Sequence, residues 1–485
     1  MKYFKGNANG GLTPITSEWM HKILMEFEKL NQLITEYGSP INLHNLSTFE
    51  QNIKKFNKVF NSRGLRHQIY YARKANKSRG LVKQALDSGI GVDTASFKEL
   101  LQSLELGGNS NSLVLTSAIK TTDQIELAIQ NNITIILDNY DECKLINSIS
   151  SRLGIKAEVG IRVSGFYVNK KKLYSRFGFD VDETIPFITN HFGKNNELAN
   201  LSLKGLHFHL DGYSTEQRGV ALSSCITIAS QLKEKGFHIS FIDMGGGILM
   251  NYLANEQEWK DFDNRLRESV QKGNSSITFN GNGLGYEMVN GKLNGKLKTY
   301  PFFNSTNGVD FLNEILDYRD PNIDKNNTDR LKSENIEIRI EPGRSLLNQT
   351  GITVAKVAHR KKDSKGQWLV GLEMNMSQLM SSSADFLLDP YIIYNTYTES
   401  SEEVDVYFTG AYCLERDILL KRKITLPKLP ERGDIVVFVN TAGYMMHFFE
   451  TEAHLFELSK NLMFKEDKPS IKEIDFIEDS LITLK

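Results

Sequence analysis

Residues 68–93 read QIYYARKANKSRGLVKQALDSGIGVD, and this stretch contains a complete strand–helix–strand unit. QIYYARK at 68–74 and IGVD at 90–93 have the short, β-rich composition of buried strands. Between them, LVKQALDSG has apolar residues three and four positions apart, as in an amphipathic helix. A helical crossover of this kind pairs two strands in parallel. Lys74 stands where the first strand ends, so we expect it to have a specific partner.

The same alternation continues as far as residue 341. Six further β-rich runs end in polar or glycine positions, mostly with helical patterns between them. The runs are SLVLTS, ITIILD, AEVGIRV, LKGLHFHL, ISFIDM and IEIRIE, which begin at residues 112, 133, 157, 203, 239 and 336. Eight such units predict an α/β fold with a TIM-like (β/α)8 barrel rather than an open doubly wound sheet.

The chain beyond EPGR, at 341–344, has a different pattern. Runs such as ITVAKVAHRKK, EVDVYFTG and DIVVFVNTAGY are short strands without long helices between them, and they predict a mainly antiparallel β domain. SPINLHNLSTFEQNIKKF, near residue 39, is expected to add the first strand from the N-terminal side. We therefore expect a barrel over 46–340 and a discontinuous β domain made of 1–45 and 341–485.

One segment of the barrel domain, at about 270–330, fits neither pattern. The chain between residues 248 and 340 is longer than one crossover needs, and it contains NGNGLGYEMVNGKLNGK. Asn290-Gly291 in this stretch is a strong hairpin signal. We interpret the segment as an insertion, either a lid-like excursion or a decoration of the surface.

The composition excludes several classes of partner. Lys and Arg number 58 against 59 acidic residues, so the charge gives no reason to expect nucleic acid or an anionic membrane as a partner. No apolar run reaches the length that spans a bilayer, and the N-terminus lacks the apolar core of a signal peptide. The three cysteines are too few and too scattered for a disulfide framework or a zinc site, so no metal site is predicted. A cytoplasmic protein is expected.

Residues with distinctive chemistry fall at the carboxyl ends of the predicted strands, where barrel enzymes place their active sites. They are Lys74, Asp93, Arg162, His209, Gly245, Gly246, Gly247, Glu341 and Arg344. The glycines offer consecutive backbone amides suited to binding a phosphate, and the planar guanidinium of Arg344 could bind the same phosphate. Each feature alone has a structural alternative, such as a simple turn, a salt bridge or a hydrogen-bonded core histidine.

A lysine, a phosphate cradle and a carboxylate together indicate pyridoxal phosphate. A partly desolvated lysine near a phosphate is a candidate for Schiff-base chemistry, which points to Lys74. Glu341 would keep the pyridine nitrogen protonated, so that the ring can accept electrons. His209 would stack on the ring.

At these residues the chain resembles the fold-type III pyridoxal-phosphate enzymes of the ornithine, diaminopimelate and arginine decarboxylase family, which have an alanine racemase-like barrel. YARKAN is similar to the family's YAVKAN, GVDTASFKEL to its DxAS-x-x-E stretch, SRFG to SKFG, and IDMGGGI and EPGR to its phosphate-binding segments. The resemblance implies cofactor contacts from Lys74, Asp93, Arg162, His209, Gly245, Gly246, Gly247, Glu341, Gly343, Arg344 and Tyr444.

Two motifs of the β domain also resemble the family. GAYCLERD is similar to G-x-x-C-x-x-x-D, which implies a catalytic role for Cys413 as proton donor at Cα. NTAGYMMHF is similar to the DAGAY region, which implies a phosphate contact from Tyr444. In the family this cysteine comes from the partner subunit, so a homodimer with shared active sites is implied.

The departures from the family lie mostly in substrate recognition. Leu414 stands where the family usually has an acid that contacts the distal end of the substrate. In SSSADF, Ser381 stands where diaminopimelate decarboxylases have an arginine, which removes an anchor for a distal carboxylate. Asp385 and Asp417 are candidate substrate residues, and a solvent-facing loop aspartate is the alternative for Asp385.

Two further departures lie close to the cofactor motifs. LDGYS, at 210–214, replaces the family's Gly-Ser after the histidine, so that a phosphate contact is lost or moves to Ser214 or the Gly212 amide. Arg73 stands where the family prefers an apolar residue, and it can face either the barrel exterior or the site.

These observations predict pyridoxal-phosphate-dependent decarboxylation of an amino acid, with a diamino or conjugated amino acid as a candidate substrate. A racemase of similar design is the nearest rival, and Cys413, Asp417 and EPGR favour the decarboxylase. A catalytically silent regulatory homologue is the second rival, although a silent copy would not need to keep the lysine, histidine, glutamate and cysteine together.

Overall fold

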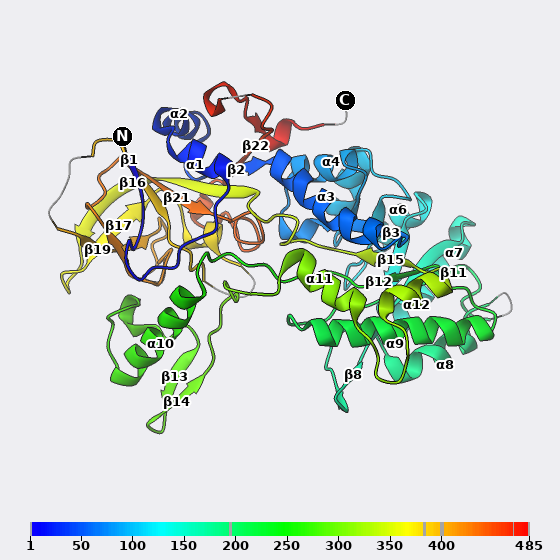
Figure 1. Ribbon diagram of the computed structural model, residues 1–485. Helices are drawn as coiled ribbons and strands as arrows, with labels where there is room; N and C mark the ends of the chain where they lie inside the picture. The colour runs from blue at the N-terminus through cyan, green and yellow to red at the C-terminus, as the bar shows by residue number, and fades with distance from the viewer. Residues whose placement is uncertain (1, 194–195, 382–384, 398–401, 469, 484–485) are drawn as a thin grey trace. The chain divides into compact units, whose positions relative to one another are not determined.

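The computed structural model describes residues 2–193, 196–381, 385–397, 402–468 and 470–483, and they form two compact units. The barrel unit contains Glu50–Leu249 and Thr306–Leu346. The β unit contains the chain up to Phe49, Met250–Ser305 and Leu347–Ile482. Figure 1 shows both units. Within the described ranges, no helix is both long enough and apolar enough to cross a membrane.

The barrel unit is built on a closed parallel sheet. Its strands are β3 (His67–Ala72), β4 (Gly91–Thr94), β5 (Leu113–Leu115), β6 (Thr134–Leu137), β7 (Ala157–Ser164), β11 (Leu201–His207), β12 (Phe241–Asp243) and β15 (Glu337–Ile340). Each strand pairs in parallel with the next, and β15 returns to β3. The predicted TIM-like barrel is confirmed, and all eight of its expected strands are present.

Close packing inside the barrel depends on small residues opposite large ones. Tyr70, Val114, Ile136 and Phe241 form a buried apolar cluster. A Cβ atom on Gly205 of β11 would overlap the ring of Phe241. The absent side chain therefore leaves the space that this ring fills, as dense barrel interiors require.

Helices connect the strands and cover the barrel. They are α3 (Leu46–Ser62), α4 (Arg79–Asp87), α5 (Phe97–Glu105), α6 (Thr122–Gln130), α7 (Tyr140–Leu153), α8 (Val181–His191), α9 (Thr215–Glu234), α11 (Gly308–Asp317) and α12 (Asn327–Glu334). Side-chain caps fix several of the starting positions: Thr121, Asn139 and Ser214 accept backbone N–H bonds at the first turns of α6, α7 and α9. A two-residue strand, β10 (Phe179–Asp180), pairs with β7.

The β unit contains a ten-stranded sheet. Its strands are β1 (Lys2–Lys5), β2 (Ile41–Asn45), β16 (Gly351–Lys362), β17 (Trp368–Leu372), β18 (Tyr391–Tyr394), β19 (Val404–Thr409), β20 (Ile424–Leu426), β21 (Ile435–Val439), β22 (Lys460–Phe464) and β23 (Ile477–Glu478). Most pairings are antiparallel, whereas β2–β22 and β17–β19 are parallel. The helices α1 (Glu18–Leu24) and α2 (Phe27–Tyr37) bury their apolar faces in one core with β2, β16 and β21.

The segment that fitted neither sequence pattern divides between the two units. Residues 250–305 group with the β unit, whereas the sequence pattern predicted that all of 46–340 belongs to the barrel domain. Contacts with Thr13 explain this grouping: its backbone N–H and hydroxyl donate to Glu258 of α10 (Glu256–Lys272) at 2.7 and 2.8 Å. The predicted hairpin is confirmed, because β13 (Tyr286–Val289) and β14 (Lys292–Gly295) pair around Asn290-Gly291.

Candidate active site

Lys74 lies in the short 3-10 turn Arg73–Ala75 that follows β3, and it is beside a buried acid. Its Nζ atom is 3.3 Å from Oδ2 of Asp93 on β4. The side chain of Lys74 is 35% exposed, whereas that of Asp93 is 1% exposed. Burial, and then the charge of Glu341, raises the pKa of Asp93, and Lys74 opposes this shift. Lys74 is therefore oriented by a buried carboxyl group and still accessible to a ligand.

The neighbouring Arg73 has a different environment. It is buried and donates hydrogen bonds to the carbonyl oxygen of Glu99 (2.8 Å) and to the side chain of Gln102, both on α5. Arg73 thus faces the helical layer and connects β3 to α5. In the same region, Ser96 Oγ accepts from Glu99 N, and Glu99 Oε2 accepts from Ala95 N at 2.7 Å. The family-like serine and glutamate therefore cap a helix.

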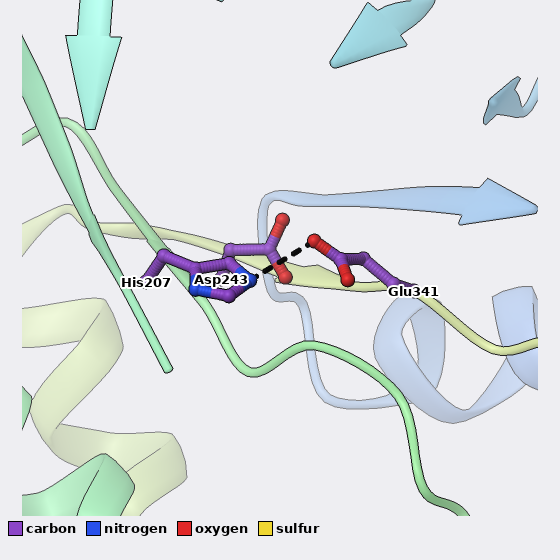
Figure 2. A group of neighbouring side chains, drawn as sticks. All are labelled: His207, Asp243 and Glu341. Carbon is purple, nitrogen blue, oxygen red and sulfur yellow. Dashed lines mark hydrogen bonds and ion pairs between the residues drawn. The ribbon is translucent and has the colours of Figure 1, made fainter. Parts of the chain in front are cut away.

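A buried trio lies beneath the carboxyl ends of β11, β12 and β15. Nε2 of His207 is 3.1 Å from Oε1 of Glu341, and the carboxyl group of Asp243 lies beside both (Figure 2). Burial raises the pKa of Glu341, and burial with the neighbouring Glu341 raises the pKa of Asp243 well above its ordinary value. Burial also lowers the pKa of His207 well below its ordinary value, so this imidazole is neutral.

The trio can hold a proton more readily than a cation. Its donor atoms lie within 4.8 Å of one another, which is close enough for a metal ion. However, His207 and Glu341 already contact each other, and both carboxyl groups have raised pKa values that favour their protonated forms. His207 was not among the residues predicted from the sequence; its only signal is that it is the first of the two histidines in GLHFHL, two positions before His209.

The three glycines after β12 form a tight loop with little room for side chains. Gly245 and Gly247 have φ angles of 63° and 82°. A Cβ atom on Gly246 would lie 2.6 Å from the carbonyl oxygen of Glu341, and a Cβ atom on Gly245 would lie 2.6 Å from Nδ1 of His209. Glycine is thus required by close approach at Gly246 and by both conformation and approach at Gly245.

Two of the three glycine amides already have acceptors. Gly245 N donates to Oδ1 of Asp243 at 2.9 Å, and Gly246 N donates to Nδ1 of His209 at 3.1 Å. Burial and the nearby cations Lys74 and Arg162 lower the pKa of His209 well below its ordinary value. His209 therefore presents a neutral ring, with its Nδ1 occupied. The loop was expected to offer consecutive exposed amides to a phosphate; among the described residues, only the amide of Gly247 in this loop has no protein acceptor.

Arg162, on β7, is held by an acid and an aromatic ring. Its Nη1 atom is 3.8 Å from Oδ1 of Asp138, and its guanidinium lies 4.3 Å from the ring centroid of Phe177. Gly178 has a φ angle of 78°, and a Cβ atom there would lie 2.7 Å from the carbonyl oxygen of Arg162. The SRFG segment therefore packs closely over Arg162.

EPGR follows β15 and lies beside the strand that carries the lysine. Ala72 N donates to the carbonyl oxygen of Pro342 at 3.2 Å. Glu341 and Arg344 are both buried, with exposed fractions of 2% and 9%. The barrel unit thus brings Lys74, Asp93, Arg162, His209, the glycines, Glu341, Gly343 and Arg344 to the carboxyl ends of its strands.

The other predicted residues lie in the β unit. Cys413 is exposed, and Tyr444 is half-buried with a φ angle of 72°. The two carboxylate oxygens of the buried Asp417 accept backbone N–H bonds from Met376 and Tyr412, each at 2.7 Å. Asp417 therefore fixes the loop that presents Cys413. Asp385 is 2.9 Å from Nζ of Lys421, and residues 382–384 of SSSADF lie outside the described ranges.

Comparison with known proteins places these features in context. Residues 46–280 match the family model of the pyridoxal binding domain of pyridoxal-dependent decarboxylases. Uncharacterized protein y4yA of Sinorhizobium fredii is 29% identical over 450 residues, 92% of each chain. Diaminopimelate decarboxylase of Staphylococcus aureus is 21% identical over 445 residues, 91% of this chain and 89% of that protein. The crystal structure of diaminopimelate decarboxylase from Helicobacter pylori with L-lysine has the same fold: the TM-score is 0.65 at 22% identity, covering 92% and 95% of the chains.

Proposed function

This chain belongs to the fold-type III pyridoxal-phosphate-dependent decarboxylases, and from this membership we propose that it decarboxylates an amino acid with the cofactor held at Lys74. Pyridoxal phosphate is the cofactor of the family. The observation that carries the proposal for Lys74 is its position, accessible yet 3.3 Å from the buried Asp93, at the carboxyl end of the barrel.

The residues of the barrel unit fit this cofactor. Lys74 is an amine that a ligand can reach, and His209 is neutral, as an aromatic face for stacking should be. Glu341 is a buried acid of raised pKa, suited to hold a proton close to a pyridine nitrogen. When bound, the cofactor supplies an electron sink for the bond that breaks at Cα of the substrate.

The chain's own residues have distinct roles in this proposal. Glu341 holds a proton at Oε, and His207 keeps that carboxyl group in place through its contact with Oε1. Asp93 orients Lys74, and Arg162 contributes a fixed positive charge. The acids and cations are buried or half-buried, so water screens their interactions weakly.

Cys413 is proposed as the proton donor at Cα, supplied by a second copy of the chain. The exposed rings of His454 and Phe456 lie beside its loop: the buried Tyr412 stacks with His454, with 5.1 Å between ring centroids, and its centroid is 5.9 Å from that of Phe456. Leu414 next to it is 43% exposed. Clustered exposed apolar groups favour coverage by another protein chain, which supports a homodimer with shared active sites. The composition supports a cytoplasmic location.

The substrate is proposed to be an amino acid without the distal carboxylate of diaminopimelate. Ser381 lacks the positive charge that would form an ion pair with a distal carboxylate, and Leu414 lacks the negative charge that would pair with a distal ammonium. Asp385 remains a candidate for a diamino acid, although its carboxylate already pairs with Lys421. A bulky or conjugated amino acid is the other substrate class that this arrangement allows.

The test begins with the absorption spectrum of the purified protein incubated with pyridoxal phosphate. Borohydride reduction followed by mass spectrometry should place the cofactor on Lys74. Lys74→Ala should abolish this adduct, and the exposed Lys77→Ala should retain it.

Product analysis with L- and D-amino acids, including diamino and conjugated ones, then distinguishes the activities. Carbon dioxide release supports the decarboxylase. Loss of optical activity without carbon dioxide would instead favour a racemase, and absence of any adduct would favour a silent homologue.

A further inference from the structure

Arg218, on α9, is a buried cation with little neutralisation. Its side chain is 2% exposed, and its Nη2 atom donates to the carbonyl oxygen of Leu210 at 3.0 Å. Its Nε and Nη1 atoms are buried, and across the described ranges neither has a hydrogen-bond partner. Burial lowers the pKa of Arg218 to about 10, so the guanidinium remains charged at neutral pH.

A buried guanidinium with two nitrogens that lack hydrogen-bond partners is unusual. Removing a cation from water is costly unless an anion or several hydrogen bonds compensate it. No carboxylate lies within ion-pair distance of Arg218 in the part of the chain that the structure describes. By contrast, the buried Arg330 on the adjacent α12 donates to Ser223 and Thr227 of the same helix α9.

The guanidinium lies against the third glycine of the loop after β12. A Cβ atom on Gly247 would overlap Nη2 of Arg218, so the absence of a side chain admits the arginine. Gly245 N and Gly246 N donate to Asp243 and His209, whereas Gly247 N has no acceptor among the described residues. Among the described residues, the Gly247 amide and two guanidinium nitrogens of Arg218 therefore lack hydrogen-bond partners, and these two residues are neighbours in space.

We propose that Arg218 binds the phosphate group of pyridoxal phosphate, together with the amide of Gly247. The inference rests on the proposed function, because it assigns a further cofactor contact in the same site. A phosphate dianion would balance the buried positive charge, and its oxygens would accept the N–H groups that the protein leaves without partners. In this proposal the glycine loop mainly leaves room for the Arg218 guanidinium, and it contributes a single backbone amide to the phosphate.

The test compares ligands that differ only in the phosphate. Dissociation constants of pyridoxal phosphate and pyridoxal are measured by absorbance titration of the cofactor-free full-length protein, with wild type, Arg218→Met, Arg218→Lys and the control Arg330→Met. Arg218→Met should weaken pyridoxal phosphate binding at least about tenfold and leave pyridoxal binding unchanged. The quantity compared between variants is the ratio of the dissociation constant of pyridoxal to that of pyridoxal phosphate. Arg218→Lys should give an intermediate ratio, and Arg330→Met should keep the wild-type ratio. Inorganic phosphate should compete only with pyridoxal phosphate.

An unchanged ratio in Arg218→Met would overturn the proposal and show that the arginine only supports the loop. If the variants do not fold, ³¹P NMR of the wild-type complex decides: a shift that stays constant between about pH 5.5 and 8.5 is expected, and titration near the ordinary second phosphate pKa of about 6 would overturn it. Failure of wild type to bind either ligand would refute the proposed function as well. Binding and borohydride trapping at Lys74 with an unchanged ratio would refute only the role of Arg218.

Discussion

Nε2 of His207 lies 3.1 Å from Oε1 of Glu341, although 134 positions separate the two residues in the sequence. The contact joins the end of β11 to the residue after β15, across β12, which pairs with both strands. Because both side chains are buried, the hydrogen bond between them replaces hydrogen bonds to water that each loses on folding. The carboxyl group proposed to face the pyridine nitrogen therefore has a fixed orientation before any cofactor binds.

Replacing His207 by leucine should leave Glu341 with one fewer partner. We expect a loss of about 1–3 kcal/mol in the free energy of unfolding, measured with urea on the cofactor-free protein. His207→Gln retains a donor and should lose less. His238→Gln, at an exposed histidine, is the control and should be neutral. Equal stability of the leucine variant and wild type would contradict a structural role for the contact.

Asp243→Asn should change the pH dependence of stability. The raised pKa of Asp243 means that the folded protein keeps a proton that the unfolded chain releases above about pH 4. The wild-type protein therefore loses stability as the pH rises from about 4 toward the pKa of Asp243 in the folded state. Asp243→Asn has no such proton to retain, so its stability lacks this decrease. The difference in unfolding free energy should shift in favour of the variant with increasing pH.

Denaturant titrations of the cofactor-free protein between about pH 4 and pH 8 measure this difference. Asp141→Asn, at a side chain that is 90% exposed, is the control and should follow the wild-type curve. A pH-independent difference between Asp243→Asn and wild type would contradict the raised pKa.

Gly246→Ala should damage the loop after β12. The added methyl group would lie 2.6 Å from the carbonyl oxygen of Glu341, a backbone atom that cannot rotate away. We expect a loss of about 1–3 kcal/mol in stability and weaker retention of pyridoxal phosphate on dialysis.

Gly212→Ala is the control: it tests the effect of an unfavourable backbone conformation without the steric overlap that Gly246→Ala introduces. Gly212 has a φ angle of 78° and no atom within 4 Å of its Cβ position, so the variant should lose only about 1 kcal/mol and retain the cofactor. Wild-type cofactor retention by Gly246→Ala would show that the loop can relax.

Asp417→Ala should disturb the loop that carries Cys413. It removes the acceptors of the Tyr412 and Met376 amides, and each unsatisfied buried amide costs about 1–3 kcal/mol. We expect lower stability and a changed rate of Cys413 alkylation by iodoacetamide. Asp417→Asn, which retains one acceptor, should be milder. If Asp417 instead contacts substrate, both variants would keep the wild-type alkylation rate and lose only activity.

Local patterns were sufficient for the barrel and insufficient for parts of the β unit. The eight barrel strands were predicted because each buried parallel strand is a compact apolar run bounded by helices. The N-terminal β1, together with β18 and β22, was not predicted, because short strands in long irregular segments lack such boundaries.

Local patterns in the sequence were enough to predict the barrel, the position of Lys74 just beyond its first strand, and the hairpin at Asn290-Gly291, because each depends on residues that are neighbours along the chain. The folded arrangement of distant segments establishes that Arg73 faces α5, that His207 supports Glu341, and that the amides of Gly245 and Gly246 donate to Asp243 and His209. It also decided that Arg218 lies against Gly247. Side-chain partners are set by which distant segments fold into contact, and the spacing of residues along the chain does not encode that.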